Sequence, residues 1–188
     1  MLSIKQEPVT SRTLRQHASV SIAFTVSAVF DLEIIDRGLG GWRLTERPVA
    51  PYVKDYDALE PPTFAERWDT RAWVLLSAFR GERRVGGAVV AWRTPGLALL
   101  EGRDDLAALV DIRIGPRLRR RGLGSRLFVA ACAWARERQC RQLKIETQNV
   151  NLPACRFYAR QGCELRAIQP HAYPALPNEV QLLWYIDL

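Results

Sequence analysis

The segment from Ile112 to Arg126 holds six arginines and no acidic residue, and two closely spaced glycines lie within it. Gly122 and Gly124 leave the backbone open, and a helix that begins there presents unpaired N–H groups and the positive end of its dipole. Nearby guanidinium groups add charge-assisted hydrogen bonds. The segment therefore predicts a cradle for a pyrophosphate group. The six arginines are Arg113, Arg117, Arg119, Arg120, Arg121 and Arg126.

The amino-acid sequence of this segment excludes two familiar classes of phosphate-binding protein. It has no G-x-x-x-x-G-K-[ST] motif, and Gly122 and Gly124 lack the third glycine of a dinucleotide fingerprint, so neither an ATPase nor a nicotinamide enzyme is indicated. The chain carries a net charge of +7, and nearly all of that excess lies here. A nucleic-acid or membrane surface needs basic residues over a longer footprint. We therefore expect a compact phosphate-bearing ligand, with no nucleic acid and no membrane as partner.

The cysteines and histidines do not indicate a metal site. Cys132, Cys140, Cys155 and Cys163 include no C-x-x-C pair, and the chain has only 2 histidines, so a structural zinc site is not predicted. Cysteines of this kind are taken up by the core as small apolar residues. The weakly polar run 19–30 is too short to span a bilayer, and no leader-like segment precedes a cleavage site. We expect a cytoplasmic protein that needs no metal.

Regular elements are predicted on both sides of the basic turn. The apolar run Leu106–Ile114 predicts a buried strand that ends at Gly115. After Gly122, apolar residues at helical spacing predict an amphipathic helix that runs to about Cys140. A strand is expected over 142–147. These elements place the basic turn between a strand and a helix.

The next helix has recognisable ends. Asn151 suits the N-cap, Pro153 is tolerated in the first turn and Gly162 favours the C-terminal stop. The other elements predicted by composition and alternation are strands over 20–35, 42–46, 73–79, 85–92, 163–168 and 179–186, a short helix over 63–68, and a loop over 48–62.

Nothing in the sequence divides the chain. No internal repeat and no Gly/Ser-rich linker interrupts the 188 residues, so we expect a single domain over 1–188, with residues 1–17 loosely held. A chain of this size buries enough surface to fold without disulfides or metals. Strands followed by strand-helix-strand-helix and then strands predict an α/β fold, a mixed sheet flanked by helices.

Two motifs resemble those of the GNAT N-acetyltransferase superfamily. The run Arg119-x-x-Gly122-x-Gly124 is similar to that superfamily's R-x-x-G-x-G/A motif for acetyl-CoA. Asn151-x-x-Ala154-x-x-Phe157-Tyr158, followed by Gly162, is similar to its second motif, N-x-x-A-x-x-[LF]-Y-x-x-x-G-F. The stretch 146–158 and the ending 178–185 resemble the streptothricin acetyltransferase branch in particular.

The resemblance implies a GNAT fold with acetyl-CoA as co-substrate. That fold has a central mixed, mostly antiparallel sheet of about six or seven strands, flanked by about four helices and splayed between the fourth and fifth strands. In it the pantetheine arm lies along the fourth strand, and the pyrophosphate lies on the amides that follow. The residues implied as cofactor-binding are Ile112, Arg113, Ile114, Arg119, Arg120, Arg121, Gly122, Leu123, Gly124, Ser125, Asn151, Arg156 and Tyr158.

Acetylation of an amine needs a base for the amine, hydrogen-bond donors for the oxyanion and an acid for the departing thiolate. The resemblance implies Tyr158 as the general acid. We expect Asp111, in an otherwise apolar strand, to be the base, with Glu146 on the adjoining strand as second choice. In the alternative interpretation Arg113 or a backbone amide satisfies Asp111, and Glu146 pairs with a neighbouring arginine.

The predicted reaction is direct attack of a primary amine on acetyl-CoA. A small cationic amine of the streptothricin type is the leading acceptor, and a protein N-terminus or lysine is the second. An alternative of another class is a non-catalytic acyl-CoA-binding module. Dimers are common among proteins of this resemblance, so a homodimer is one expected assembly. Acids in loops that could face a cationic acceptor are Asp55, Asp57, Glu60, Asp104 and Asp105.

Overall fold

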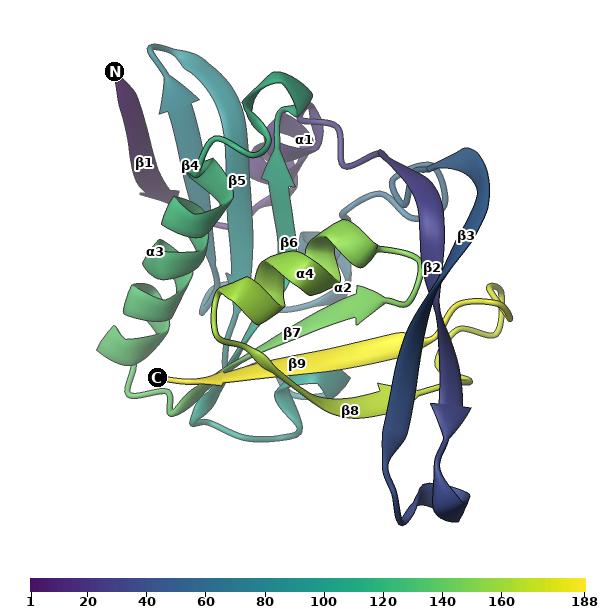
Figure 1. Cartoon of the computed structure of the whole chain (residues 1–188). Helices are drawn as coiled ribbons and strands as arrows, with labels where there is room; N and C mark the ends of the chain where they lie inside the picture. The colour runs from purple at the N-terminus through teal and green to yellow at the C-terminus, as the bar shows by residue number, and fades with distance from the viewer. The chain divides into compact units, whose positions relative to one another are not determined.

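The computed structural model describes residues 1–188, the whole chain (Figure 1). A seven-stranded sheet has the strand order β1-β4-β5-β6-β7-β9-β8, and a separate ribbon pairs β2 with β3. Neighbours from β1 to β6 are antiparallel, whereas β6 and β7 are parallel. The predicted α/β fold with a mixed, mostly antiparallel sheet is confirmed. The elements are β1 (Leu2–Glu7), α1 (Ser11–Ala18), β2 (Phe24–Ile34), β3 (Trp42–Lys54), α2 (Phe64–Arg67), β4 (Val74–Arg80), β5 (Arg83–Ala91), β6 (Leu106–Ile114), α3 (Leu123–Glu137), β7 (Gln142–Gln148), α4 (Leu152–Arg160), β8 (Glu164–Gln169) and β9 (Gln181–Asp187).

The chain divides into two compact units, which we describe separately. Unit 1 comprises Met1–Ala23, Asp55–Ile145 and Tyr185–Leu188, and unit 2 comprises Phe24–Lys54 and Glu146–Trp184. The expectation of a single domain over residues 1–188 therefore stays a prediction.

In unit 1, helices cover both faces of the sheet around β5. Gly86 and Gly87 are adjacent on this strand, so they face opposite sides of the sheet. A Cβ atom on Gly86 would lie 3.5 Å from Leu123 of α3, and one on Gly87 would lie 2.8 Å from the ring of His17 on α1. Gly87 thus allows α1 to approach one face, whereas α3 lies at ordinary contact distance on the other face (Figure 1).

The N-terminal residues, which the sequence predicts to be loosely held over 1–17, form a strand and a helix. β1 forms an antiparallel ladder with β4 in which Leu2 lies opposite Arg80. A capping box between Thr10 and Thr13 starts α1, and Leu14 is buried. A polar strand and a short polar helix have little periodic signal of their own, and they are ordered here by contacts with the sheet.

β3 is longer than its sequence pattern predicts. We expected a strand over 42–46 and a loop over 48–62, yet β3 continues to Lys54 and pairs with β2 along its length. Pro48 lies opposite Ala28, next to a shift of register. A two-stranded ribbon has only edge strands, and an edge strand tolerates proline because one side of it needs no amide donor.

The elements on either side of the basic turn agree with the prediction. β6 covers the predicted residues, and α3 begins at Leu123, directly after the basic turn. The β6–β7 ladder pairs Leu106–Leu109 with Gln142–Ile145, whereas β6 continues to Ile114. β6 and β7 therefore stop pairing after Leu109, as expected for the two strands that the family resemblance predicts to splay apart. No helix combines the length and the apolar character needed to cross a bilayer.

Candidate active site

The turn between β6 and α3 presents a row of amides without a protein acceptor. Leu118 and Arg119 donate their amides to Gly115 and Pro116, and Arg126 makes the first helical bond, to Gly122. The amides of residues 120–124 lie between these bonds and donate to no group of the protein. Arg120 and Gly122 have φ angles of 60° and 80°, and left-handed residues in such a turn bring successive N–H groups to a concave face that binds anions.

Two of the six arginines turn inward and do not contribute side-chain charge to this turn. The Arg119 guanidinium donates to the carbonyls of Ile114, Ala23 and Ser21 at 3.1, 2.9 and 3.1 Å. Arg113 is buried. Arg119 therefore supports the shape of the turn. The four remaining arginines of the segment, which form no ion pair, are Arg117, Arg120, Arg121 and Arg126.

Ile112 and Ile114 turn their backbone polar groups away from β5. Gly115 donates its amide to Val85, and in an antiparallel ladder such bonded pairs alternate with non-bonded ones. Ile114 lies opposite Gly86 and Ile112 opposite Ala88, so both belong to non-bonded pairs. Their amides point to the edge of β6 where no ladder with β7 continues, an edge that can accept an extended ligand.

Asp111 lies in a buried charge cluster of unit 1. Arg113 donates to its carboxylate from Nε at 2.9 and 3.0 Å and from Nη2 at 2.7 Å. The Nε2 atom of His17 is 3.3 Å from Oδ1, although neither ring nitrogen makes a well-aligned hydrogen bond. Burial alone raises the pKa of Asp111, but attraction to His17, and then to Arg113, holds that pKa below its usual value. The alternative in which Arg113 satisfies Asp111 is confirmed.

Arg113 also binds Asp57 in the loop that precedes α2. Its Nη1 and Nη2 atoms donate to the two carboxylate oxygens at 2.5 and 2.8 Å. One buried guanidinium therefore bridges two carboxylates. Burial acts to lower the pKa of Arg113, but the hydrogen bonds and charges of Asp57 and Asp111 raise it above its usual value.

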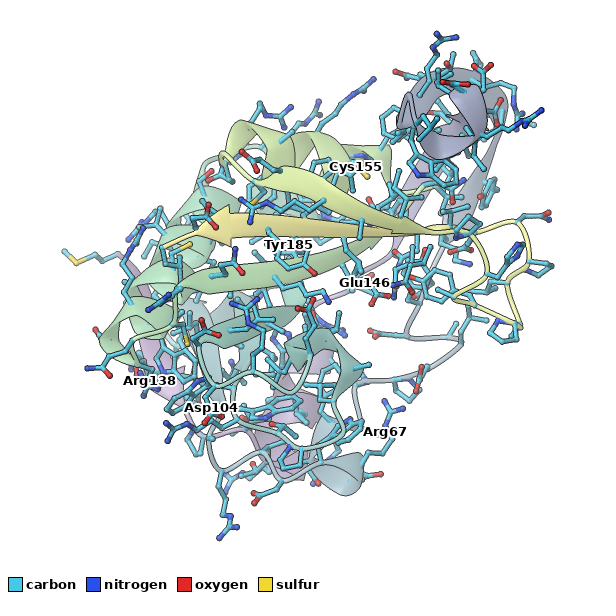
Figure 2. All side chains as sticks on the ribbon, turned by 90° about the horizontal axis from the view of Figure 1, so that it is seen from below. Arg67, Asp104, Arg138, Glu146, Cys155 and Tyr185 are labelled. Carbon is cyan, nitrogen blue, oxygen red and sulfur yellow. The ribbon has the colours of Figure 1, made fainter.

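Glu146, in unit 2, is bound by neutral donors. The Tyr173 hydroxyl donates to Oε1 at 2.5 Å, and the Gln181 side-chain amide donates to Oε2 at 2.8 Å. The interpretation that Glu146 pairs with an arginine is wrong. Thr147 contacts Cys155 of α4 at 3.4 Å, so Glu146 faces the opposite side of β7 (Figure 2). No side chain compensates the charge of this carboxylate.

Helix α4 places the other predicted residues of unit 2. Asn151 accepts the amide of Ala154 at 3.2 Å, which confirms it as the N-cap. Tyr158 is 3% exposed, and its ring packs edge-on against Phe157 with the centroids 5.1 Å apart. Arg156 forms an ion pair with Glu46 of β3, so its guanidinium is already engaged.

Sequence reasoning missed the residues that complete these two clusters. Nothing in the spacing of His17 connects it to Asp111, and Gln181 gives no signal as a partner of Glu146. The loop acids expected to face a cation also have partners, because arginines bind the carboxylates of Asp57, Glu60 and Asp105. No group of three His, Cys, Asp or Glu side chains comes together as a metal site would require.

Known proteins are similar to this chain in sequence and in fold. A model of the acetyltransferase (GNAT) family matches residues 41–163. Streptothricin acetyltransferase from Escherichia coli is 30% identical over 165 residues, which are 86% of this chain and 84% of that protein. Streptothricin acetyltransferase A from Bacillus subtilis is 28% identical over 78% of this chain and 80% of its own. A Bacillus anthracis protein, provisionally assigned as a streptothricin acetyltransferase and solved in complex with acetyl coenzyme A, aligns with a TM-score of 0.78 at 24% identity over 100% of this chain and 99% of its own.

Proposed function

The chain belongs to the acetyltransferase (GNAT) family and is an acetyl-CoA-dependent N-acetyltransferase, and from this premise we propose that its acceptor is a small cationic amine of the streptothricin type. Two curated relatives of that name span most of the chain and support this acceptor. The structural observation that carries the proposal is the Glu146 carboxylate, which has donors on both oxygens and no counter-ion. Such a group favours a ligand that arrives as a cation.

The residues of the turn fit acetyl-CoA. The free amides of residues 120–124, with Arg120 and Arg121 beside them, would hold the diphosphate. The backbone of Ile112 and Ile114 would hold the pantetheine arm along the open edge of β6. When bound, acetyl-CoA supplies the thioester that the amine attacks. Arg113 would contact acetyl-CoA through its backbone only, because its side chain forms ion pairs with Asp57 and Asp111.

We assign the base to Glu146 and not to Asp111. Asp111 lies beside His17 and binds the buried guanidinium of Arg113. These groups, His17 first, lower its pKa and make it a poor proton acceptor. Glu146 has no cation to oppose its protonation. In the reaction the amine nitrogen bonds to the acetyl carbon as the carbon–sulfur bond breaks. The ammonium of the acceptor loses two protons. Glu146 takes the first, which leaves the nitrogen neutral for attack. Tyr158 gives its proton to the departing thiolate, and the second proton from the nitrogen restores Tyr158.

The acceptor is tested by thiol release from acetyl-CoA in the presence of different amines. With the purified full chain, we expect release with streptothricin, and little with a lysine peptide or with a peptide that offers only its N-terminal amine. Mass spectrometry of the product should show one added acetyl group. Turnover of a peptide without turnover of streptothricin would reject the small-molecule acceptor in favour of a protein acceptor.

The cradle is tested by Gly122→Ala. Gly122 has a φ angle of 80°, and a residue with a Cβ pays about 1–2 kcal/mol for this conformation. Relaxation of the turn would redirect its amides, so we expect the Kd for acetyl-CoA, measured calorimetrically, to rise about 10-fold. The matched control is Gly102→Ala, with φ at 68° in another loop of unit 1. Equal affinity in both variants would contradict the cradle.

We further propose that both units form one acetyltransferase domain, because the family match over 41–163 runs through segments of each. Four buried cysteines, all free, suit the reducing cytoplasm. A homodimer remains the expectation drawn from the family.

A further inference from the structure

We infer that Tyr173 and Gln181 are positioning residues that hold the Glu146 carboxylate in its basic, outward-facing form for proton transfer from the acceptor. The inference rests on the proposed function, in which Glu146 is the base. Tyr173 lies outside the stretches that resemble the family, and Gln181 lies within the ending 178–185 that resembles one branch of it.

The hydrogen bonds of the cluster run in one direction. The Gln148 side-chain amide donates to the Tyr173 oxygen at 3.0 Å. The Tyr173 oxygen therefore accepts from Gln148, and its hydroxyl proton is donated to Glu146 Oε1 at 2.5 Å. Gln181 holds the other oxygen at 2.8 Å. Because the donors come from β9 and from the loop before it, they restrain the carboxylate from two separate elements.

Comparison with the other buried or half-buried carboxylates sets Glu146 apart. All of the others except Asp55, which accepts the amide of Asp57, have a cationic side chain within ion-pair distance. Glu146 has two neutral donors instead. A cationic partner would suppress its basicity, while neutral donors orient it and leave its charge uncompensated. The buried or half-buried carboxylates with cationic partners are Glu7 with Arg84, Asp57 and Asp111 with Arg113, Asp105 with Arg103, and Glu179 with Lys54.

Among the titratable side chains near Glu146, Tyr173 is the one that forms a hydrogen bond with its carboxylate. Lys144, two residues earlier on β7, has its ammonium on Glu101 at 2.7 Å. His171, in the same loop as Tyr173, is exposed. Burial, followed by the charge of Glu146, raises the pKa of Tyr173 well above its usual value. The phenol therefore stays protonated and remains a donor, which suits positioning and disqualifies it as the general acid.

The decisive variant is Tyr173→Phe, which removes the hydroxyl and keeps the ring. A hydrogen bond to a charged group contributes about 1.5–3 kcal/mol, so its loss removes one of the two donors that stabilise and orient the Glu146 carboxylate. Because the base must be ionised, we expect the acidic limb of the kcat profile to move to higher pH. Because the carboxylate is then held from one side only, we expect kcat at neutral pH to be about 10-fold lower. The KM for acetyl-CoA should not change.

A matched control separates this effect from the loss of any phenol–glutamate bond. Tyr185 donates to Glu101 at 2.5 Å in unit 1, so Tyr185→Phe removes the same kind of bond elsewhere and should leave the pH profile in place. Gln181→Leu removes the second donor and should shift the acidic limb in the same direction as Tyr173→Phe. This second variant keeps the test open if Tyr173→Phe folds poorly.

Glu146→Gln distinguishes failure of this inference from failure of the proposed function. We expect Tyr173→Phe to have no further effect on kcat in the Glu146→Gln background, because the group it positions is gone. If Glu146→Gln is inactive but the pH profile is unshifted in Tyr173→Phe and in Gln181→Leu, the positioning role alone is overturned. A fully active Glu146→Gln would overturn the assignment of the base as well.

Discussion

Tyr158→Phe is expected to lower kcat by about 10²–10³-fold, the range for loss of a positioned general acid. The variant keeps the aromatic ring that packs edge-on against Phe157, so the fold should be preserved. It removes the only proton that the side chain can give to the departing thiolate. The measurement is thiol release under saturating acetyl-CoA and acceptor, together with calorimetric binding of acetyl-CoA, whose Kd should stay unchanged.

The pH dependence adds an independent check on Tyr158. An acid must be protonated to act, so turnover of the parent enzyme should fall at high pH, and Tyr158→Phe should lose that alkaline limb along with most of its rate. Tyr185→Phe serves as the matched control here too. Unchanged kcat in Tyr158→Phe would show that the proton comes from another donor or from water.

Arg113→Met is expected to destabilise the protein by about 3–5 kcal/mol, because it leaves buried carboxylates without their cation. The Arg113 side chain is 1% exposed and binds both Asp111 and Asp57. Urea unfolding at neutral pH measures the loss. The matched control is Arg71→Met. Arg71 binds Asp69 at the same two-residue spacing, but its side chain is 91% exposed, so we expect the urea midpoint of this variant to stay close to that of the parent.

The destabilisation by Arg113→Met should shrink in acid. The folded protein holds the pKa of Asp111 below its usual value, so the stability this group contributes is present above its unfolded pKa of about 4 and is lost as the pH falls through the lower folded value. In Arg113→Met the carboxylates near position 113 can protonate at low pH and escape the unpaired charge. A loss of stability that is equal at neutral and acidic pH would contradict this account of the cluster.

Local signals in the sequence determined the elements around the cradle. The apolar run of β6, the glycine that precedes α3 and the Asn151 cap of α4 each depend on a few neighbouring residues and their backbone preferences. The excess of arginine in one turn was equally visible. These features act over one or two helical turns, so they could be predicted without knowledge of what packs against them.

The partners of the charged side chains depended on the tertiary structure. Arg113 and Arg119 look equivalent to Arg120 in sequence, yet both turn inward, to carboxylates in one case and to backbone carbonyls in the other. The strand β3 continues through Pro48 only because β2 supplies its ladder.

The assignment of the base shows most clearly which features the sequence predicts and which depend on tertiary contacts. Sequence placed Asp111 and Glu146 on neighbouring strands but could not rank them by environment. Asp111 meets His17 from α1, while Glu146 meets Gln181 and Tyr173 from the far end of the chain. A carboxylate is made a structural anchor or a base by whether a cation or a neutral donor faces it. That choice is made by residues far apart in sequence, and only folding brings them together.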